Sequence, residues 1–218
     1  MSRVIAVVQA RLGSSRLPGK VLAEINGFPM LGHVLERAKA IKGVDAVVLT
    51  TPMPEAPQMR GLPGVDRWVP HTPPDVLAGF AEAAQRAEAD IVMRLTGDCP
   101  LLDPMLCRAV LERVLAGAAY ATNARESSFG LDCQVFTREL LQSAHKWAIG
   151  QDREHVCPWM EAEQNLIAYK PLPAELSDVH WAVDTQEDLD RVRAIYAHLK
   201  PGDFSWQATR RAAREAGV

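Results

Sequence analysis

Short apolar runs alternate with helix-like patterns along most of this chain, and this alternation limits the possible folds. Residues 4–9, 46–50 and 90–96 have the length and the β-branched content of buried strands. Between the first two runs, residues 30–41 place their apolar side chains on one helical face. A regular βα order predicts an α/β fold, with a mostly parallel twisted sheet flanked by helices. We expect residues 1–218 to form a single domain.

Further elements follow from local signals. Thr72 as N-cap and Pro73 at the first helical position predict a helix to about residue 89, and Asp103 predicts another to about residue 116. Thr185, followed three residues later by Asp188, predicts a capped helix. The remaining predictions are strands at 68–69, 120–122, 133–136, 166–169 and 179–183, helices at 138–148, 153–163 and from about 205, and an irregular proline-rich loop after Thr51.

Composition excludes several classes of protein. The net charge of −3 gives no reason to expect a nucleic-acid or membrane-surface binder. The apolar runs are shorter than a membrane span requires, and no leader segment is visible. The four cysteines lack metal-site spacing, so we expect reduced thiols and a cytoplasmic protein.

A basic loop follows the first predicted strand, and it indicates a polyphosphate site. Small residues let backbone N–H groups approach an anion, and cationic side chains neutralise it. The spacing differs from a P-loop, because five residues separate the two glycines and Val21 follows the lysine. A plain surface turn is the alternative interpretation. The residues concerned are Arg11, Gly13, Ser14, Ser15, Arg16, Gly19 and Lys20.

Two aspartates follow predicted strands and face the same edge of the sheet as this loop. Asp98 comes after the strand at 90–96, and Asp184 comes after the strand at 179–183. In open α/β sheets, ligands bind outside the carboxyl ends of the strands. Mg²⁺ prefers one or two carboxylates together with phosphate oxygens and water. The pair therefore predicts a magnesium–triphosphate site, although each aspartate alone could simply cap a turn or a helix.

Five segments resemble one family in the order in which that family carries them. Together they are similar to the cytidylyltransferases that activate acidic sugars, and the nearest branch is the spore-coat-polysaccharide type. The segments are residues 9–22, 94–101, 130–136, 153–156 and 183–189.

This resemblance implies a nucleotide-diphospho-sugar transferase (Rossmann-like) fold and transfer of CMP from CTP to a sugar hydroxyl, with release of pyrophosphate. It implies catalytic roles for Arg11, Lys20 and Asp98, and Mg²⁺ binding by Asp98 and Asp184. The resemblance also implies that the chain binds CTP and a small sugar, and that it forms a homodimer with a second copy of itself. The implied nucleotide-binding residues are Arg11, Gly13, Ser14, Ser15, Arg16, Lys20, Thr96 and Gly97, and the implied sugar-binding residues are Asp132, Gln134 and His155.

The chain departs from the family pattern mainly on the sugar and base side. The departures are Ser128-Phe129, Gln134 and the segment 71–75. His155 is equally well interpreted as a structural helix residue. The alternatives are a related nucleotidyltransferase or glycosyltransferase with another base or sugar, and a nucleotide-binding paralogue without turnover.

Overall fold

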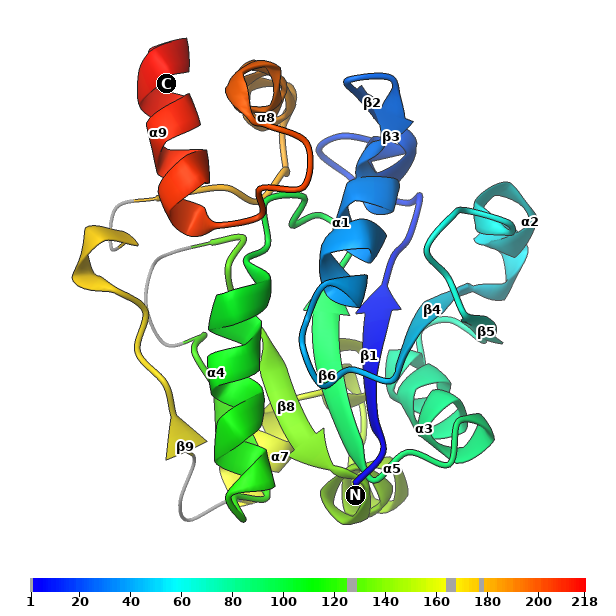
Figure 1. The fold of residues 1–218 in the computed structure, drawn as a ribbon. Coiled ribbons are helices and arrows are strands. Elements are labelled where there is room, and N and C mark those ends of the chain that lie inside the picture. The colour runs from blue at the N-terminus through cyan, green and yellow to red at the C-terminus, as the bar shows by residue number, and fades with distance from the viewer. Residues whose placement is uncertain (1, 125–128, 164–167, 177–178) are drawn as a thin grey trace.

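The computed structural model describes residues 2–124, 129–163, 168–176 and 179–218. Within these ranges, a seven-stranded sheet has the order β5-β4-β1-β6-β8-β7-β9 (Figure 1). Its strand β8 is antiparallel to both neighbours, and the other pairs are parallel. The bounds are β1 Val4–Gln9, β4 Ala46–Pro52, β5 Arg67–His71, β6 Ile91–Thr96, β7 Tyr120–Thr122, β8 Gln134–Thr137 and β9 Ala168–Tyr169, with a separate hairpin of β2 Glu24–Ile25 and β3 Phe28–Pro29.

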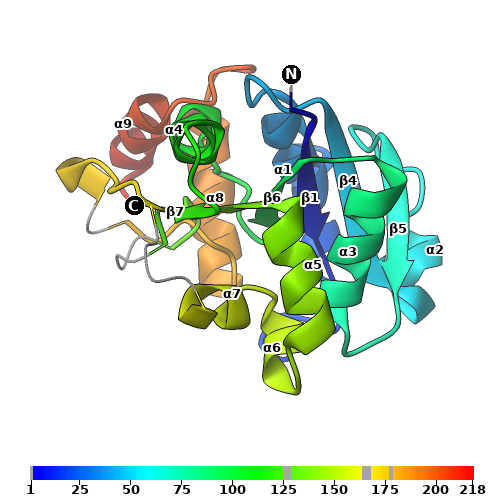
Figure 2. The same ribbon diagram turned by 90° about the horizontal axis from the view of Figure 1, so that it is seen from below.

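Helices cover both faces of this sheet (Figure 2). One face carries α1 Met30–Lys39, α4 Pro104–Leu115, α8 Gln186–His198 and α9 Trp206–Ala216. The other face carries α3 Val76–Arg86, α5 Arg138–Trp147 and α7 Pro158–Glu163. The short helices α2 Ala56–Met59 and α6 Gln151–His155 lie near the carboxyl ends of the parallel strands, where they follow β4 and α5.

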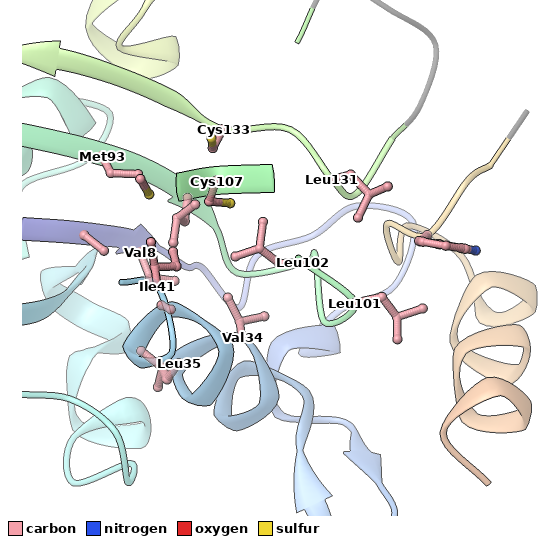
Figure 3. Packing of buried hydrophobic residues seen from close by; sticks show 14 of the residues in the cluster. Val8, Val34, Leu35, Ile41, Met93, Leu101, Leu102, Cys107, Leu131 and Cys133 are labelled. Atoms are coloured by element: carbon pink, nitrogen blue, oxygen red, sulfur yellow. The ribbon is translucent and has the colours of Figure 1, made fainter. Parts of the chain in front are cut away.

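Strand β1 contributes to two hydrophobic clusters because its side chains alternate between the faces of the sheet. Val4 and Val8 belong to the cluster beneath α1 and α4, whereas Ile5 and Val7 pack beneath α3 and α5. All four side chains are buried. Figure 3 shows the first cluster, in which strand residues meet Val34, Leu35, Leu101, Leu102 and Cys107.

The predicted α/β class with a mostly parallel sheet is therefore confirmed. From β1 the chain proceeds to β4 and β5 on one side, and β6 then lies on the other side of β1. This reversal of strand order leaves a crevice at the carboxyl ends of the strands, where α/β proteins bind ligands. The loop after β1 therefore lies at the mouth of that crevice.

Two predicted helix boundaries are wrong, and prolines explain both. Helix α3 begins after Asp75, whose carboxylate accepts a hydrogen bond from the Ala78 N–H at 3.0 Å. Thr72 is not the cap, because Pro73, the predicted first helical residue, precedes Pro74 and is therefore disfavoured in helical conformation. The Thr72 carbonyl instead accepts from the Asp75 N–H in a turn. The helix predicted at 153–163 is divided into α6 and α7, since Val156 has a φ of 72° and Cys157 precedes Pro158.

The strand predicted at 179–183 is also wrong. The segment is extended and its centre is buried, but it pairs with loops rather than with a strand. Trp181 donates its N–H to the Phe129 carbonyl at 2.8 Å, and Val183 donates to the Asp98 carbonyl at 2.9 Å. The proline-rich loop after Thr51 contains a 3-10 turn and α2. Residues 166–167 of the strand predicted at 166–169 lie outside the described ranges, as does Ser128.

Candidate active site

A cavity of about 420 Å³ opens at the carboxyl ends of β1, β4, β5 and β6. It brings together eleven of the residues that the sequence singled out. They are Arg11, Gly13, Ser14, Ser15, Arg16, Lys20, Thr96, Gly97, Asp98, His155 and Asp184. The cationic loop and the two aspartates thus share one cavity, as the sequence predicts.

Lys20 joins the two aspartates at the floor of this cavity. Its Nζ donates to Asp98 Oδ2 at 2.9 Å, to Asp184 Oδ1 at 2.9 Å and to the Val183 carbonyl at 2.7 Å. Gly19, with a φ of 71°, lets the chain turn into the short 3-10 helix Lys20–Leu22 that directs this side chain inward. Lys20 is only 7% exposed, so the ammonium group depends on these oxygens for its solvation.

Lys20 and Asp98 keep each other ionised. Burial alone would lower the pKa of Lys20, but the carboxylates outweigh burial and raise the pKa above its ordinary value. Burial alone would raise the pKa of Asp98, but the adjacent ammonium group lowers it below its ordinary value. A lysine and an aspartate that both stay charged at neutral pH suit a site that handles anions and cations.

Two arginines rise above this floor and remain largely exposed. Arg16 Nη2 lies 2.9 Å from Asp184 Oδ1, and Arg11 Nη1 lies 3.3 Å from Glu154 Oε1. Their side chains are 63% and 65% exposed, so these ion pairs are weak and exchangeable. An incoming polyphosphate can therefore replace the carboxylates as partner of both guanidinium groups.

Asp184 is fixed by loop contacts, although the segment before it is not a strand. The Val183 N–H is held by the Asp98 carbonyl, which ties the two aspartates together through the backbone. The Asp188 carboxylate, which forms the capping box of α8 with Thr185, also accepts from the Asp184 N–H at 3.0 Å. The predicted cap at Thr185 is thus confirmed, and it positions Asp184 as well as starting the helix.

The end of the cavity beside β4 and β5 has a different character. Its wall carries prolines and a buried imidazole: Pro52, His71, Pro73, Pro74 and Val76. His71 Nδ1 shares a hydrogen bond with Thr50 Oγ1 at 3.1 Å, and burial lowers the pKa of His71 despite nearby Asp75 and Glu55. A neutral, mostly apolar wall suits a flat heterocycle, whereas the opposite end suits phosphates.

Helix α6 supplies the third wall. An ion pair between Arg153 Nη2 and Asp75 Oδ2 at 2.7 Å ties α6 to the start of α3. This contact brings Glu154 and His155 into the cavity lining. Arg153 therefore acts as a structural anchor, and His155 is exposed at the cavity rim.

Two predicted sugar-side residues lie elsewhere. Asp132 and Gln134 are not among the described residues that line the cavity. Gln134 is buried on β8, where its Oε1 accepts from Arg94 Nη1 at 2.8 Å. Arg94 Nε in turn donates to Gln9 Oε1 at 3.0 Å, and Gln9 does line the cavity. Gln134 thus reaches the site only through other side chains, and its predicted role in sugar binding stays a prediction.

Sequence reasoning assigned no individual site role to several lining residues. His71, Glu55, Pro52 and Glu154 all belong to the cavity. His71 and Pro52 end β5 and β4, so the rule that ligands lie at strand ends could have identified them. Glu55 accepts a hydrogen bond from the Leu12 N–H and so supports the basic loop, a contact with no signal in the sequence.

A family model described as "Cytidylyltransferase" matches residues 5–206, nearly the whole chain. The chain belongs to the cytidylyltransferase family. A 3-deoxy-manno-octulosonate cytidylyltransferase of Anaeromyxobacter is 29% identical, and the match covers 90% of this chain and 98% of that protein. The predicted family and enzyme class are therefore confirmed.

Solved structures of other proteins share the fold of this cytidylyltransferase. A cytidylyltransferase from Leptospira borgpetersenii superposes with a TM-score of 0.89 at 26% identity, covering 100% of this chain and 96% of that one. The fold of a CMP:2-keto-3-deoxy-manno-octonic acid synthetase, solved with CTP, matches with a TM-score of 0.69 at 24% identity, covering 90% and 99%. The predicted Rossmann-like nucleotidyltransferase fold is confirmed.

The described residues contain neither a cluster of metal-ligating side chains nor a membrane-spanning helix. No group of three or more His, Cys, Asp or Glu side chains among them could hold a metal by itself. None of the described helices is long and apolar enough to cross a membrane.

Proposed function

We propose that this cytidylyltransferase, as a single domain of residues 1–218, transfers CMP from CTP to a hydroxyl group of an acidic sugar. The observation that carries the proposal is the position of Lys20, which lies between Asp98 and Asp184 beneath the exposed Arg11 and Arg16. The charged side chains are gathered at this end of the cavity, whereas the end beside β4 and β5 carries prolines and His71. A nucleoside triphosphate has the same division between its charged and flat parts.

In this reaction the sugar hydroxyl oxygen attacks the α-phosphorus while the bond to the pyrophosphate oxygen breaks, and the hydroxyl proton is released to water. Negative charge increases on the phosphoryl oxygens and on the departing pyrophosphate. Lys20 and Arg16 would neutralise that charge, and Arg11 would hold the outer phosphates in line for attack. The backbone N–H groups and hydroxyls of Ser14 and Ser15 would add hydrogen-bond donors.

Mg²⁺ is the metal that the donor set suits. Asp98 and Asp184 both direct a carboxylate oxygen to Lys20 Nζ, so the two side chains would hold the metal together, and phosphate oxygens and water would supply its other ligands. When bound, Mg²⁺ supplies charge neutralisation at the phosphates. Two carboxylates without a third protein ligand fit a metal whose remaining ligands come from the bound nucleotide and water.

Other features remain part of the proposal. The relative named as a 3-deoxy-manno-octulosonate cytidylyltransferase supports an acidic sugar acceptor. The resemblance to the spore-coat-polysaccharide branch supports a role in surface polysaccharide or glycan synthesis. All four cysteines are free thiols, which suits the reducing cytoplasm. A homodimer is expected from the family resemblance, and light scattering after size-exclusion chromatography would measure it.

The proposal is tested by thermal unfolding with CTP, UTP, ATP and GTP, each with and without Mg²⁺. A ligand at 100 times its Kd adds about 2.7 kcal/mol of apparent stability. We expect the largest rise in Tm with CTP and Mg²⁺ together. Equal melting curves with every nucleotide would contradict the proposal.

A further inference from the structure

The two carboxylates that would hold the metal are already occupied by a cation of the chain itself. An ammonium group has three N–H donors, and Lys20 Nζ uses them on three oxygens, of Asp98, Asp184 and the Val183 carbonyl, at 2.7 to 2.9 Å. These oxygens surround a side chain that is only 7% exposed. The group therefore has a complete set of partners inside the protein.

The local charge is also balanced. Asp98 and Asp184 carry two negative charges, and Lys20 and Arg16, which both contact Asp184, carry two positive charges. A free divalent cation would meet a neutral cluster with an ammonium group at its centre. Like charges repel most strongly where water is excluded, so Lys20 opposes the entry of that cation.

We infer that Lys20 keeps the two-aspartate site closed to a free divalent cation, and that a triphosphate opens the site by taking Lys20 as its own partner. This inference rests on the proposed function. Lys20 belongs to the same basic loop as Arg11 and Arg16, so phosphates that bind there lie within reach of its ammonium group. Once Lys20 turns to phosphate oxygens, the two carboxylates are left without their buried cation and attract the metal.

The consequence is an order of binding. Metal alone binds weakly, nucleotide binding increases metal affinity, and by linkage metal increases nucleotide affinity by the same factor. Metal-free nucleotide can enter first, because its phosphates meet exposed arginines rather than a bound metal. The lysine thus couples two ligands through one side chain.

The test measures the affinity for Mn²⁺ alone, by calorimetry or electron paramagnetic resonance, in the wild type and in variants of two cations. Lys20→Met keeps the length of the side chain and removes its charge. We expect it to bind Mn²⁺ alone more tightly than the wild type by about 5- to 150-fold, the usual range for coupled sites. Lys20→Arg retains a cation and should keep the weak wild-type affinity.

Arg16→Met is the matched control, because it removes the same charge from the cluster but leaves Lys20 between the aspartates. We expect a gain there of no more than about threefold, since Arg16 is 63% exposed and solvent screens its charge. No gain in Lys20→Met, or equal gains in Lys20→Met and Arg16→Met, would overturn the inference. Lys20→Gln, which can still donate to Asp98, serves if Lys20→Met does not fold.

Mn²⁺ binding by the wild type in the presence of CTP distinguishes a failure of the proposed function from a failure of the role inferred for Lys20. If the wild type binds neither CTP nor Mn²⁺ with CTP, the proposed function fails. If this ternary complex forms and Lys20→Met gains no affinity for Mn²⁺ alone, only the role of Lys20 as a closing cation fails.

Discussion

Gly130 packs directly against the backbone of Trp181. A Cβ atom at position 130 would lie 2.5 Å from the Trp181 carbonyl carbon, too close for any side chain. The backbone of Gly130 also has a φ of 100°, which residues with side chains rarely adopt. This contact fixes the extended segment that ends at Asp184, so Gly130 positions a site residue without lining the cavity.

Gly130→Ala should therefore lower both stability and activity. We expect a loss of about 1 to 3 kcal/mol in the free energy of unfolding from overpacking, measured by chemical denaturation. Gly117→Ala is the matched control, because Gly117 has a φ of 110° but a Cβ atom added there would meet no other atom within 4 Å. A loss in Gly130→Ala no larger than in Gly117→Ala would show that the packing against Trp181 is unimportant.

Lys20→Ala should reduce turnover by about two to three orders of magnitude, the usual effect of removing one electrostatic stabiliser of a transition state. Steady-state release of pyrophosphate measures this change. Lys39→Ala is the control, because Lys39 forms an exposed ion pair with Asp66 far from the cavity. Near-normal turnover in Lys20→Ala would contradict the proposed phosphate-binding role of the basic loop.

His71→Ala should weaken CTP binding with little change in kcat, because His71 lies at the neutral end of the cavity. Loss of one hydrogen bond, about 0.5 to 1.5 kcal/mol, corresponds to about a 2- to 12-fold rise in Kd by calorimetry. Thr50→Val, which removes the partner of His71, should act in the same direction. Thr51→Val is the control, since Thr51 instead accepts from Trp68 Nε1. An equal effect of all three substitutions would contradict a role for His71 at the base.

The stability of the protein should depend on pH through Lys20 and Asp98. The lowered pKa of Asp98 contributes stability that is present above its ordinary value of 3.8 and is lost as the pH falls below it. The raised pKa of Lys20 contributes stability that is present below 10.5 and is lost as the pH rises above it. Chemical denaturation between pH 3 and pH 7 should therefore show the wild type losing its advantage over Lys20→Met on acidification. A constant difference across that range would refute this coupling.

More of the lining was predicted at the cationic end of the cavity than at the end beside β4 and β5. Arg11, Lys20 and Asp98 follow the β1 and β6 strands, whose apolar runs are unmistakable. His71 was not predicted as a site residue, because it becomes part of the cavity only when β5 pairs with β4. Burial alone also made 179–183 resemble a strand, although its hydrogen bonds go to loops.

The helix boundaries show a second limit of sequence reasoning. Asp75 rather than Thr72 caps α3, because Pro73 and Pro74 form a turn in which the Asp75 N–H donates to the Thr72 carbonyl, and the helix begins only after that turn. The pairing of Asp75 with Arg153 joins segments 78 residues apart, and no local pattern encodes it. Elements defined by local periodicity were thus predictable, whereas contacts defined by tertiary packing were not.

Transfer of CMP is tested most directly by ³¹P NMR of the wild type with CTP, Mg²⁺ and a panel of acidic sugars, 3-deoxy-manno-octulosonate included. We predict that the triphosphate signals disappear while pyrophosphate and one new phosphodiester signal appear together, and only with CTP. Bound CTP that stays intact with every acceptor, under conditions in which its binding is shown by calorimetry, would contradict the proposed reaction.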